Sequence, residues 1–426
     1  MEILRYGSTG PYVEMLQLAL LRSGYLNSQP DGIFGTHTQN AVMRFQRANG
    51  LSPDGIVGPL TYAAIKPYIT GYTVHQIRRG DSFYKLAKAY GTPIEYIISA
   101  NPDVDPLRLM IDQKIIIPYG FDVVPTTISY TYLLTQLCIE GLSVRYPSLQ
   151  RGSIGQSVLG NELYSIRIGN GSKNVMYNAS HHANEWITTP VLLHFAEEYL
   201  KALLFMTSIG STPATELFNT TVINIIPLVN PDGVDLVTGA LGKNSTAYKN
   251  AQIIAGNYPQ ISFPSGWKAN IEGTDLNLNY PAGWENAREI KFAQGFDSPA
   301  PRDYVGTAPL SAPESRAMVS YTQENNFRLT LSYHTQGEVI FWKYLDYMPP
   351  KAFDIGLQLS RASGYSLEIT PTESGYAGYK DWFIQTFNLP GYTIEAGLGG
   401  NPLPISDFPQ IYRDNEKLLV LAAMLS

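Results

Sequence analysis

The chain has 426 residues, a length that allows two or three domains. Its 44% hydrophobic and 15% charged residues are typical of a globular protein. Thirty basic residues against 36 acidic ones give a net charge of −6, which argues against a nucleic-acid-binding protein. Because no long apolar run and no basic leader followed by an apolar stretch occur, we expect neither a membrane span nor a signal peptide.

The single cysteine, Cys138, excludes an intramolecular disulfide and a cysteine zinc cage. Any bound metal must therefore use histidine and carboxylate ligands. Cys138 follows the apolar run 132–137, and we interpret it as a small core residue and not as a nucleophile.

The first 68 residues contain an internal repeat. Asp31-Gly-Ile-Phe-Gly-Thr-His-Thr38 is echoed by Asp54-Gly-Ile-Val-Gly-Pro-Leu-Thr61, and each copy leads into a helical pattern. Apolar side chains at helical spacing predict three helices, marked by Val13, Leu16, Leu20 and Leu21, by Ala41, Val42 and Phe45, and by Tyr62, Ala63 and Ile65. Residues 1–68 resemble the peptidoglycan-binding three-helix module of many wall hydrolases.

Residues 71–119 form a second small pattern. Strands are predicted at 71–74 and 113–118, and a helix begins after Arg79-Gly-Asp-Ser82, with Asp81 or Ser82 as its N-cap. Gly91 stands where a glycine would end this helix, and Ala100-Asn-Pro102 marks a turn. The order strand, helix, helix, strand resembles a LysM module, a family that binds glycans containing N-acetylglucosamine.

Residues 125–426 alternate predicted strands with predicted helices, and about 300 residues can bury one large core. This alternation predicts an α/β fold in which helices cover both faces of a sheet. The predicted strands are 163–168, 175–180, 222–229, 329–333 and 392–395, and the predicted helices are 191–204, 313–325 and 414–425.

The first chemical signal is Ser180-His-His-Ala-Asn-Glu-Trp186, at the end of a predicted strand. His182 and Glu185 lie three residues apart, so on a first helical turn they face the same side. An imidazole and a carboxylate suit Zn²⁺. His181 is the rival for the ligand position, and the spacing to Glu185 favours His182.

Two further side chains complete a candidate centre. His334 ends the apolar strand 329–333, and Glu395 ends the apolar strand 392–395. Open α/β sheets place their crevices at the carboxyl ends of strands, so both residues are expected near His182. A carboxylate such as Glu395 is suited to accept a proton from a water molecule beside a metal ion.

These separated motifs together resemble the zinc carboxypeptidases, the M14 metallopeptidases, over about 300 residues. The resemblance implies a mixed twisted sheet flanked by helices and one Zn²⁺ per chain. It identifies His182, Glu185 and His334 as metal ligands and Glu395 as the catalytic glutamate. Asn230-Pro-Asp-Gly233 and Gly273-Thr-Asp-Leu-Asn277 match two further motifs of the family. They imply that Asp275 orients the first histidine ligand and that Asn277 binds substrate.

The departures from the family pattern bear on specificity. The arginine that grips a terminal carboxylate is replaced by Leu278, which argues against ordinary carboxypeptidase action. Lys268 follows Trp267 where the family has its oxyanion arginine, and it is either that charge or a solvated surface residue. Tyr376 is the candidate for the family's mobile tyrosine. Lys380 stands in the position that lines the specificity pocket, where a cation suits an acidic side chain such as that of diaminopimelate.

The whole architecture resembles the γ-D-glutamyl-L-diamino acid endopeptidases of spore-forming bacteria. This resemblance implies hydrolysis of the amide between γ-D-glutamate and meso-diaminopimelate or lysine in peptidoglycan stem peptides. The implied partners are glycan strands and stem peptides. Cell-wall association is expected, from a cytoplasmic or mother-cell pool or by export without a signal. The alternatives are a metallocarboxypeptidase of ordinary peptides and a non-catalytic wall-binding protein.

Overall fold

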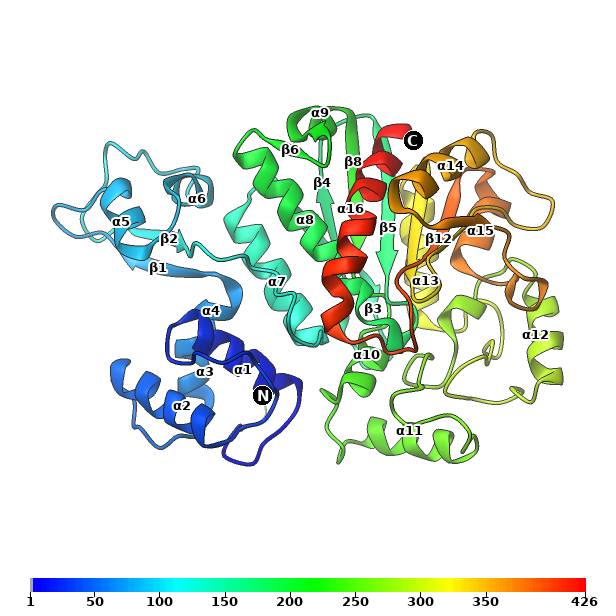
Figure 1. Ribbon diagram of the computed structural model, residues 1–426, viewed down its shortest axis with the longest axis horizontal. Coiled ribbons are helices and arrows are strands. Elements are labelled where there is room, and N and C mark those ends of the chain that lie inside the picture. The colour runs from blue at the N-terminus through cyan, green and yellow to red at the C-terminus, as the bar shows by residue number, and fades with distance from the viewer. Residues whose placement is uncertain (1–2) are drawn as a thin grey trace. The chain divides into compact units, whose positions relative to one another are not determined.

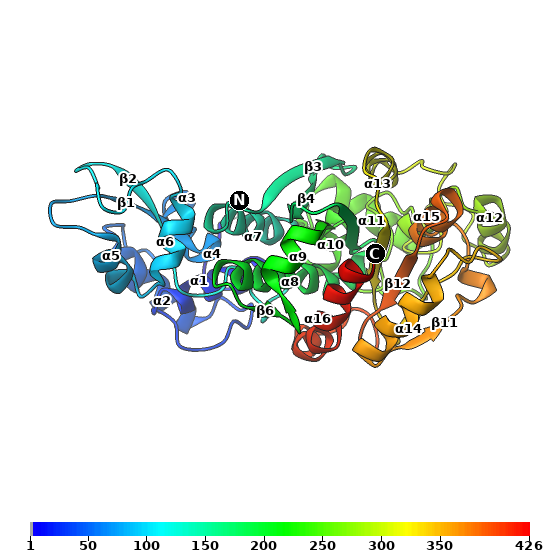
Figure 2. The same ribbon diagram turned by 90° about the horizontal axis from the view of Figure 1, so that it is seen from above.

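The computed structural model describes residues 3–426, which divide into two compact units (Figures 1 and 2). The first unit holds the residues up to Ser129 together with Gln136–Gln150. The second unit holds Tyr130–Thr135 and Arg151–Ser426. Over residues 3–426, no helix combines the length and the apolar character that crossing a membrane requires.

The chain begins with a helical module, as the repeat predicted. Its helices are α1 (Pro11–Arg22), α2 (Thr36–Ala48), α3 (Pro59–Ile65) and the short α4 (Pro67–Thr70). The predicted apolar stripes form its core, because Val13, Leu20, Ala41, Val42 and Phe45 are fully buried. The three-helix prediction is confirmed.

A buried glutamine fixes the loop of each sequence repeat. The Gln17 amide nitrogen donates to Asp31 Oδ1 at 2.7 Å and to Thr38 Oγ1 at 3.0 Å. In the second copy, Gln46 makes the same bonds to Asp54 Oδ1 at 2.9 Å and to Thr61 Oγ1 at 3.0 Å. The repeated Asp and Thr therefore serve the same structural purpose in both copies, which is to satisfy a buried amide.

The second module has the predicted order of strand, helix, helix, strand. Its elements are β1 (Tyr72–Gln76), α5 (Phe83–Tyr90), α6 (Ile94–Ala100) and β2 (Lys114–Pro118), and the two strands pair antiparallel. Ser82 is the N-cap of α5, since its side chain accepts from the Lys85 amide. Asp81 instead contacts His75 Nε2 at 2.8 Å. Gly91 ends α5 in the left-handed conformation, with φ 62°.

Helix α7 (Tyr132–Arg145) begins in the second unit and continues in the first. In the first unit, the Arg145 guanidinium donates to the carbonyls of Gly71 and Tyr119. Cys138 is fully buried, as expected of a core residue. The expected domain limits of 1–68, 71–119 and 125–426 remain predictions.

The second unit is built on an eight-stranded mixed sheet, in the order β11-β10-β12-β9-β5-β8-β4-β3. The pairs β8/β5, β5/β9 and β9/β12 are parallel, whereas β4/β8 and β10/β12 are antiparallel. The strands are β3 (Gln150–Gln156), β4 (Glu162–Ile168), β5 (Lys173–Ala179), β8 (Thr221–Ile226), β9 (Leu329–His334), β10 (Val339–Phe341), β11 (Ser366–Glu368) and β12 (Gly391–Glu395).

Helices cover both faces of this sheet, as neighbouring residues of β5 show. Met176 packs in a core cluster with Met318 of α13 (Pro313–Glu324) and Phe383 of α15 (Tyr379–Phe387). Tyr177 points to the other face, where its hydroxyl donates to the Leu419 carbonyl of α16 (Phe408–Leu425). The predicted α/β class and mixed sheet are confirmed, and the expected strands and helices are all present. Most ends shift by one to three residues, but α16 begins at Phe408 and not at 414.

The remaining elements lie around this core. They are η1 (Ala183–Glu185), α8 (Thr188–Leu204), β6 (Ser208–Ile209), β7 (Thr212–Pro213), α9 (Ala214–Thr220), α10 (Pro231–Thr238), α11 (Thr246–Gly256), η2 (Leu276–Leu278), α12 (Trp284–Ala293), α14 (Ala352–Ser363), η3 (Thr372–Ser374) and η4 (Ile405–Asp407). The parallel strands β5, β9 and β12 end at one edge of the sheet, and this edge carries the candidate site.

Candidate metal centre and substrate cleft

The first two candidate ligands lie in the loop that follows β5. The chain turns at Ser180, which has φ 54°, and then forms the 3-10 turn η1 before α8 begins. His182 and Glu185 therefore share one face of a 3-10 turn. The prediction that they lie on the first turn of an α-helix was wrong. The third candidate, His334, is the last residue of β9.

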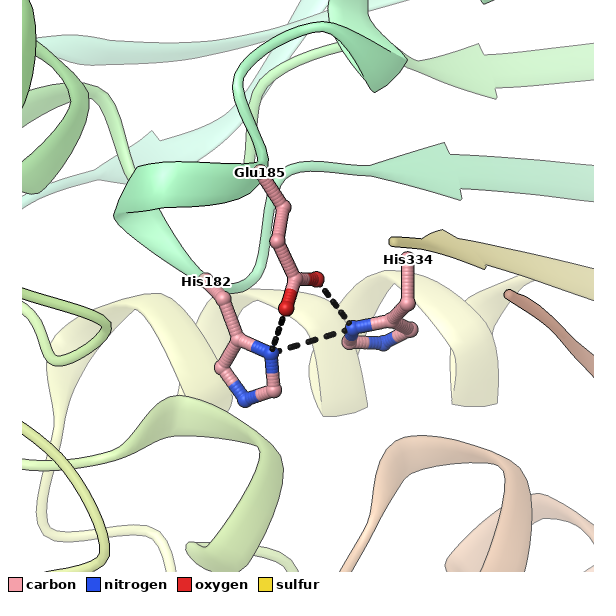
Figure 3. Close-up of side chains that lie close together, drawn as sticks. All are labelled: His182, Glu185 and His334. Atoms are coloured by element: carbon pink, nitrogen blue, oxygen red, sulfur yellow. Dashed lines mark hydrogen bonds and ion pairs between the residues drawn. The ribbon is translucent and has the colours of Figure 1, made fainter. Parts of the chain in front are cut away.

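The three side chains converge (Figure 3). The Nδ1 atoms of His182 and His334 lie 3.2 Å apart. Each also faces a Glu185 oxygen, at 3.0 Å from Oε1 and 2.8 Å from Oε2 respectively. One ligand atom from each residue lies within 4.8 Å of the others. Two imidazole nitrogens and a carboxylate in this arrangement fit Zn²⁺, which prefers these ligands and keeps a further position open in catalytic sites.

Asp275 fixes the orientation of the first ligand. Its Oδ1 contacts His182 Nε2 at 3.1 Å, which leaves Nδ1 directed toward Glu185 and His334. Asp275 is held in turn by the backbone amides of Asn277 and Asp303. A carboxylate behind a ligating histidine fixes the ring and raises its basicity, so the surroundings of His182 also fit a metal ion.

His181, the rival ligand, lies outside this cluster. Its Nε2 contacts the Tyr280 hydroxyl at 2.9 Å, and complete burial lowers its pKa well below the usual histidine value. A neutral ring that packs against Tyr280 and Tyr379 is part of the core behind the metal centre. The converging residue is His182, as the spacing to Glu185 predicted.

Glu185 is surrounded by cations and donors. Lys268 Nζ lies 3.1 Å from Glu185 Oε1, and the Thr335 amide donates to Oε2 at 3.3 Å. Burial alone would raise the pKa of Glu185, but His182 and Lys268 hold that pKa well below its usual range. Burial would likewise lower the pKa of Lys268, and the Glu185 carboxylate more than offsets it and raises that pKa. Glu185 is therefore ionised and Lys268 charged at neutral pH.

Glu395 ends β12 beside the third ligand. It is the register partner of His334 across the parallel pair β12/β9. Burial raises the pKa of Glu395 above its ordinary value, and the His334 ring opposes this rise. A carboxylate with a raised pKa at the wall of a cleft is a better proton acceptor than a solvated one.

The Asn-Pro-Asp-Gly motif holds two parts of the site together. Asn230 donates to the His181 carbonyl at 3.1 Å and to the Ala269 carbonyl at 2.9 Å, and it caps α10 through the Gly233 amide. A Cβ on Gly233 would lie 2.7 Å from the Ala269 carbonyl oxygen. The motif thus fixes the ligand loop against the segment that carries Lys268.

Two cavities adjoin each other beside this centre. The smaller has a volume of about 220 Å³, and we call it the leaving-group cavity. Its lining includes Asn277, Leu278, Lys380 and Asp381. The larger, of about 610 Å³, is lined by mostly uncharged residues, and we call it the acyl cavity; its lining includes Asn184, Gln260, Ile261, Thr335, Gln336, Val339 and Asn401. Five residues line both cavities, namely Lys268, Arg302, Phe341, Ser374 and Glu395.

The expected substrate residues take different positions. Asn277 lines the leaving-group cavity, and its side-chain oxygen accepts from the Tyr379 amide at 3.1 Å. Lys380 lines it too, but pairs with the adjacent Asp381 at 2.6 Å. Tyr376 packs in a hydrophobic cluster with Trp284, and the described residue that reaches both cavities from this loop is Ser374. The role expected of Tyr376 stays a prediction.

Three charged residues at the cleft had no signal in the sequence. Arg302, Asp303 and Lys291 line the leaving-group cavity, and Asp303 pairs with Lys291 at 2.7 Å. They come from α12 and from an irregular loop, where no periodicity or motif marks a functional residue. Only the fold of this loop over the 268–275 segment brings them to the site, through bonds such as that from the Asp275 amide to the Tyr304 carbonyl.

Comparison with known proteins agrees with this geometry. The zinc carboxypeptidase family model matches residues 136–417, a putative peptidoglycan binding domain matches residues 9–65, and a LysM domain matches residues 75–118. The chain is 44% identical over 391 residues to gamma-D-glutamyl-L-diamino acid endopeptidase 1 of Lysinibacillus sphaericus, covering 79% of this chain and 96% of that one.

Two further relatives are more distant. The spore cortex-lytic enzyme of Bacillus subtilis (strain 168) is 33% identical over 99 residues, which are 22% of this chain and 32% of that protein. The crystal structure of thrombin activatable fibrinolysis inhibitor superposes with a TM-score of 0.56 at 17% identity, covering 83% of this chain and 98% of that one. This last similarity supports the fold assignment alone.

Proposed function

The chain belongs to the zinc carboxypeptidase (M14 peptidase) family and is a zinc metallopeptidase, and from this premise we propose that it hydrolyses peptidoglycan stem peptides. The bond cleaved is the amide between γ-D-glutamate and the diamino acid. The relative named for this activity aligns over 96% of its length, and two wall-binding modules precede the peptidase. The observation that carries the proposal is the pair of cavities that share Glu395 in their lining, because two adjoining cavities accommodate a chain that continues on both sides of the scissile bond.

The proposed mechanism uses residues at the wall shared by the two cavities. His182, Glu185 and His334 would hold Zn²⁺, which when bound acidifies water and polarises the carbonyl. Glu395 accepts a proton from the attacking water and returns it to the leaving amine. Lys268 stabilises the negative charge that develops on the carbonyl oxygen, as the family arginine would, but as a point charge.

The leaving-group cavity suits a diamino acid. Asn277 holds the backbone of this residue, and Lys380 with Asp381 offers a cation and an anion side by side. The far end of meso-diaminopimelate carries both a carboxylate and an ammonium group, whereas the far end of lysine carries only an ammonium group. The ion pair therefore favours diaminopimelate as the natural diamino acid.

Both alternative functions conflict with particular residues. An ordinary carboxypeptidase needs an arginine that binds the terminal carboxylate through two hydrogen bonds. Leu278 stands at that position and packs with Trp284 in a hydrophobic cluster. A non-catalytic scaffold would tolerate loss of the metal ligands, but all three are present and converge.

The two N-terminal modules indicate association with the cell wall. We propose that the substrate is the peptidoglycan of a sporulating cell, in keeping with the relative named for lysis of the spore cortex.

The deciding experiment uses L-Ala-γ-D-Glu-meso-diaminopimelate and mass spectrometry. We expect release of diaminopimelate, abolished by a chelator and restored by Zn²⁺. An α-linked L-peptide of equal length serves as the control substrate and should remain intact. If single C-terminal residues are released from the control while the γ-linked peptide persists, the enzyme is an ordinary carboxypeptidase.

A further inference from the structure

Arg302 lies at the junction of the two cavities and has no assigned role. Its segment pairs with the segment that carries Lys268, because the amides of Lys268 and Ala269 both donate to the Pro301 carbonyl, at 2.7 and 2.9 Å. The next residue, Asp303, is tied to Asp275 through its backbone amide. The backbone of Arg302 is therefore fixed relative to the metal centre.

The Nε atom of Arg302 is hydrogen-bonded, whereas its two terminal nitrogens are available to a ligand. Its Nε donates to Asp303 Oδ2 at 2.5 Å, and Asp303 Oδ1 pairs with Lys291 at 2.7 Å. Asp303 is thus shared between two cations and compensates only part of their charge. The terminal nitrogens of Arg302 bond to no residue within 3–426, and its side chain is 42% exposed where it lines both cavities.

The acyl cavity offers few positive charges. Among the described residues that line it, the cations are Lys268 and Arg302. Lys268 is engaged with Glu185 at 3.1 Å, beside the metal centre. Because the proposed mechanism already assigns the charge of Lys268 to the carbonyl oxygen, Arg302 is the cation of this cavity that remains for a substrate carboxylate.

The γ-glutamyl linkage supplies such an anion. When glutamate is joined through its side chain, its α-carboxylate stays free on the acyl side, a short aliphatic chain away from the scissile carbonyl. An α-linked peptide has an amide at that place. A guanidinium whose two terminal NH2 groups are free is the side chain that matches a carboxylate best.

We infer that Arg302 binds the free α-carboxylate of the γ-D-glutamyl residue and thereby selects γ-linked substrates. This inference rests on the proposed function and adds to it a residue that recognises the acyl side. It also predicts that stem peptides in which this carboxylate is amidated are poor substrates.

The test compares two substrates, L-Ala-γ-D-Glu-meso-diaminopimelate and the same peptide with the glutamate α-carboxylate amidated, on the full-length zinc enzyme. We expect kcat/KM to be about 10–100-fold higher for the free acid, as for a charge-assisted bidentate contact. Arg302→Met should bring the two values together by lowering that of the free acid, and Arg302→Lys should keep part of the preference. Arg328→Met is the matched control, because Arg328 precedes β9 at the end opposite to His334.

Each result decides the matter. Equal rates of the unmodified enzyme on both peptides would overturn the role of Arg302 while leaving the proposed function intact, and this comparison needs no variant to fold. A preference that survives in Arg302→Met, with normal zinc content and melting temperature, would also overturn it. Cleavage of neither peptide by the zinc-loaded enzyme would refute the proposed function itself, and the inference with it.

Discussion

The two cavities share the wall that holds Glu395 and Lys268 but differ in charge. The leaving-group cavity is small and densely charged, and it contains the pairs Lys380–Asp381 and Lys291–Asp303. The acyl cavity is nearly three times larger and is lined mainly by amide, hydroxyl and apolar side chains. If the proposed function holds, we expect the enzyme to bind the diamino acid through paired charges and the acyl chain through shape, neutral polar contacts and one arginine.

A variant at the shared wall should affect every substrate equally and by the largest factor. We expect Glu395→Gln to lower kcat by about 10³-fold or more, because the amide cannot accept the proton of the attacking water. Zinc content, measured by atomic absorption, should be unchanged, since Glu395 is not among the converging ligands. Near-normal turnover by the zinc-loaded variant would remove Glu395 from the mechanism.

The second residue of the shared wall, Lys268, should have a somewhat smaller effect. Lys268→Met removes the charge next to the carbonyl oxygen, and we expect kcat to fall by about 10²-fold, as for loss of one oxyanion donor. Lys268→Arg restores the family's residue and should recover part of the rate. Diaminopimelate and lysine substrates should lose activity in the same proportion. If the loss fell mainly on KM, Lys268 would bind substrate and not the transition state.

A variant confined to the leaving-group cavity should change selectivity and not chemistry. We expect the unmodified enzyme to prefer a diaminopimelate peptide over a lysine peptide, and Lys380→Met to reduce that preference by about 10-fold, the worth of a buried charge contact. The ratio of the two kcat/KM values, with Lys243→Met as an exposed control, measures this effect. An unchanged ratio would show that Lys380 serves only to neutralise Asp381.

The pH dependence of the unmodified enzyme tests the state of Glu395. Burial raises the pKa of this carboxyl above its ordinary value of 4.5, and only the ionised form accepts a proton. Activity should therefore fall about tenfold per pH unit below that raised pKa, well before a solvated glutamate would be protonated. A plot of kcat/KM against pH, over the range in which the zinc content is constant, gives the pH at which activity falls. A fall centred at or below pH 4.5 would mean that Glu395 is not held in a desolvated environment.

The convergence of the three candidate metal ligands and the position of Glu395 beside them were predictable, because each residue follows a strong local pattern. His334 and Glu395 end apolar strands, and parallel strands bring their carboxyl ends to one edge of the sheet. The spacing of His182 and Glu185 survives the change from an α-helical to a 3-10 turn, because both conformations place such residues on one face.

The remainder of the cleft depends on tertiary contacts that leave no trace in the sequence. Lys380 was predicted to supply a cation to the specificity pocket. Side chains of adjacent helical residues do not normally face each other, so its pairing with Asp381 could not be inferred. Arg302 and Asp303 lie in a loop without periodicity. The continuation of α7 into the first unit likewise follows from buried contacts such as those of Arg145, and not from a boundary signal near residue 125.

The smallest expected effect belongs to a neutral residue of the acyl cavity. Asn184 is 4% exposed and lines this cavity, and its Oδ1 accepts no hydrogen bond from the described residues 3–426. Its removal breaks no hydrogen bond of that oxygen and should change the free energy of unfolding little. It alters the polar lining of the acyl cavity, for which we expect about 1 kcal/mol, or a several-fold change in kcat/KM. We expect Asn184→Ala to affect diaminopimelate and lysine peptides alike, because both share the same acyl chain. A change in the ratio of their kcat/KM values would show that the two cavities are coupled. The leaving-group cavity and the acyl cavity would then not recognise the two parts of the substrate independently.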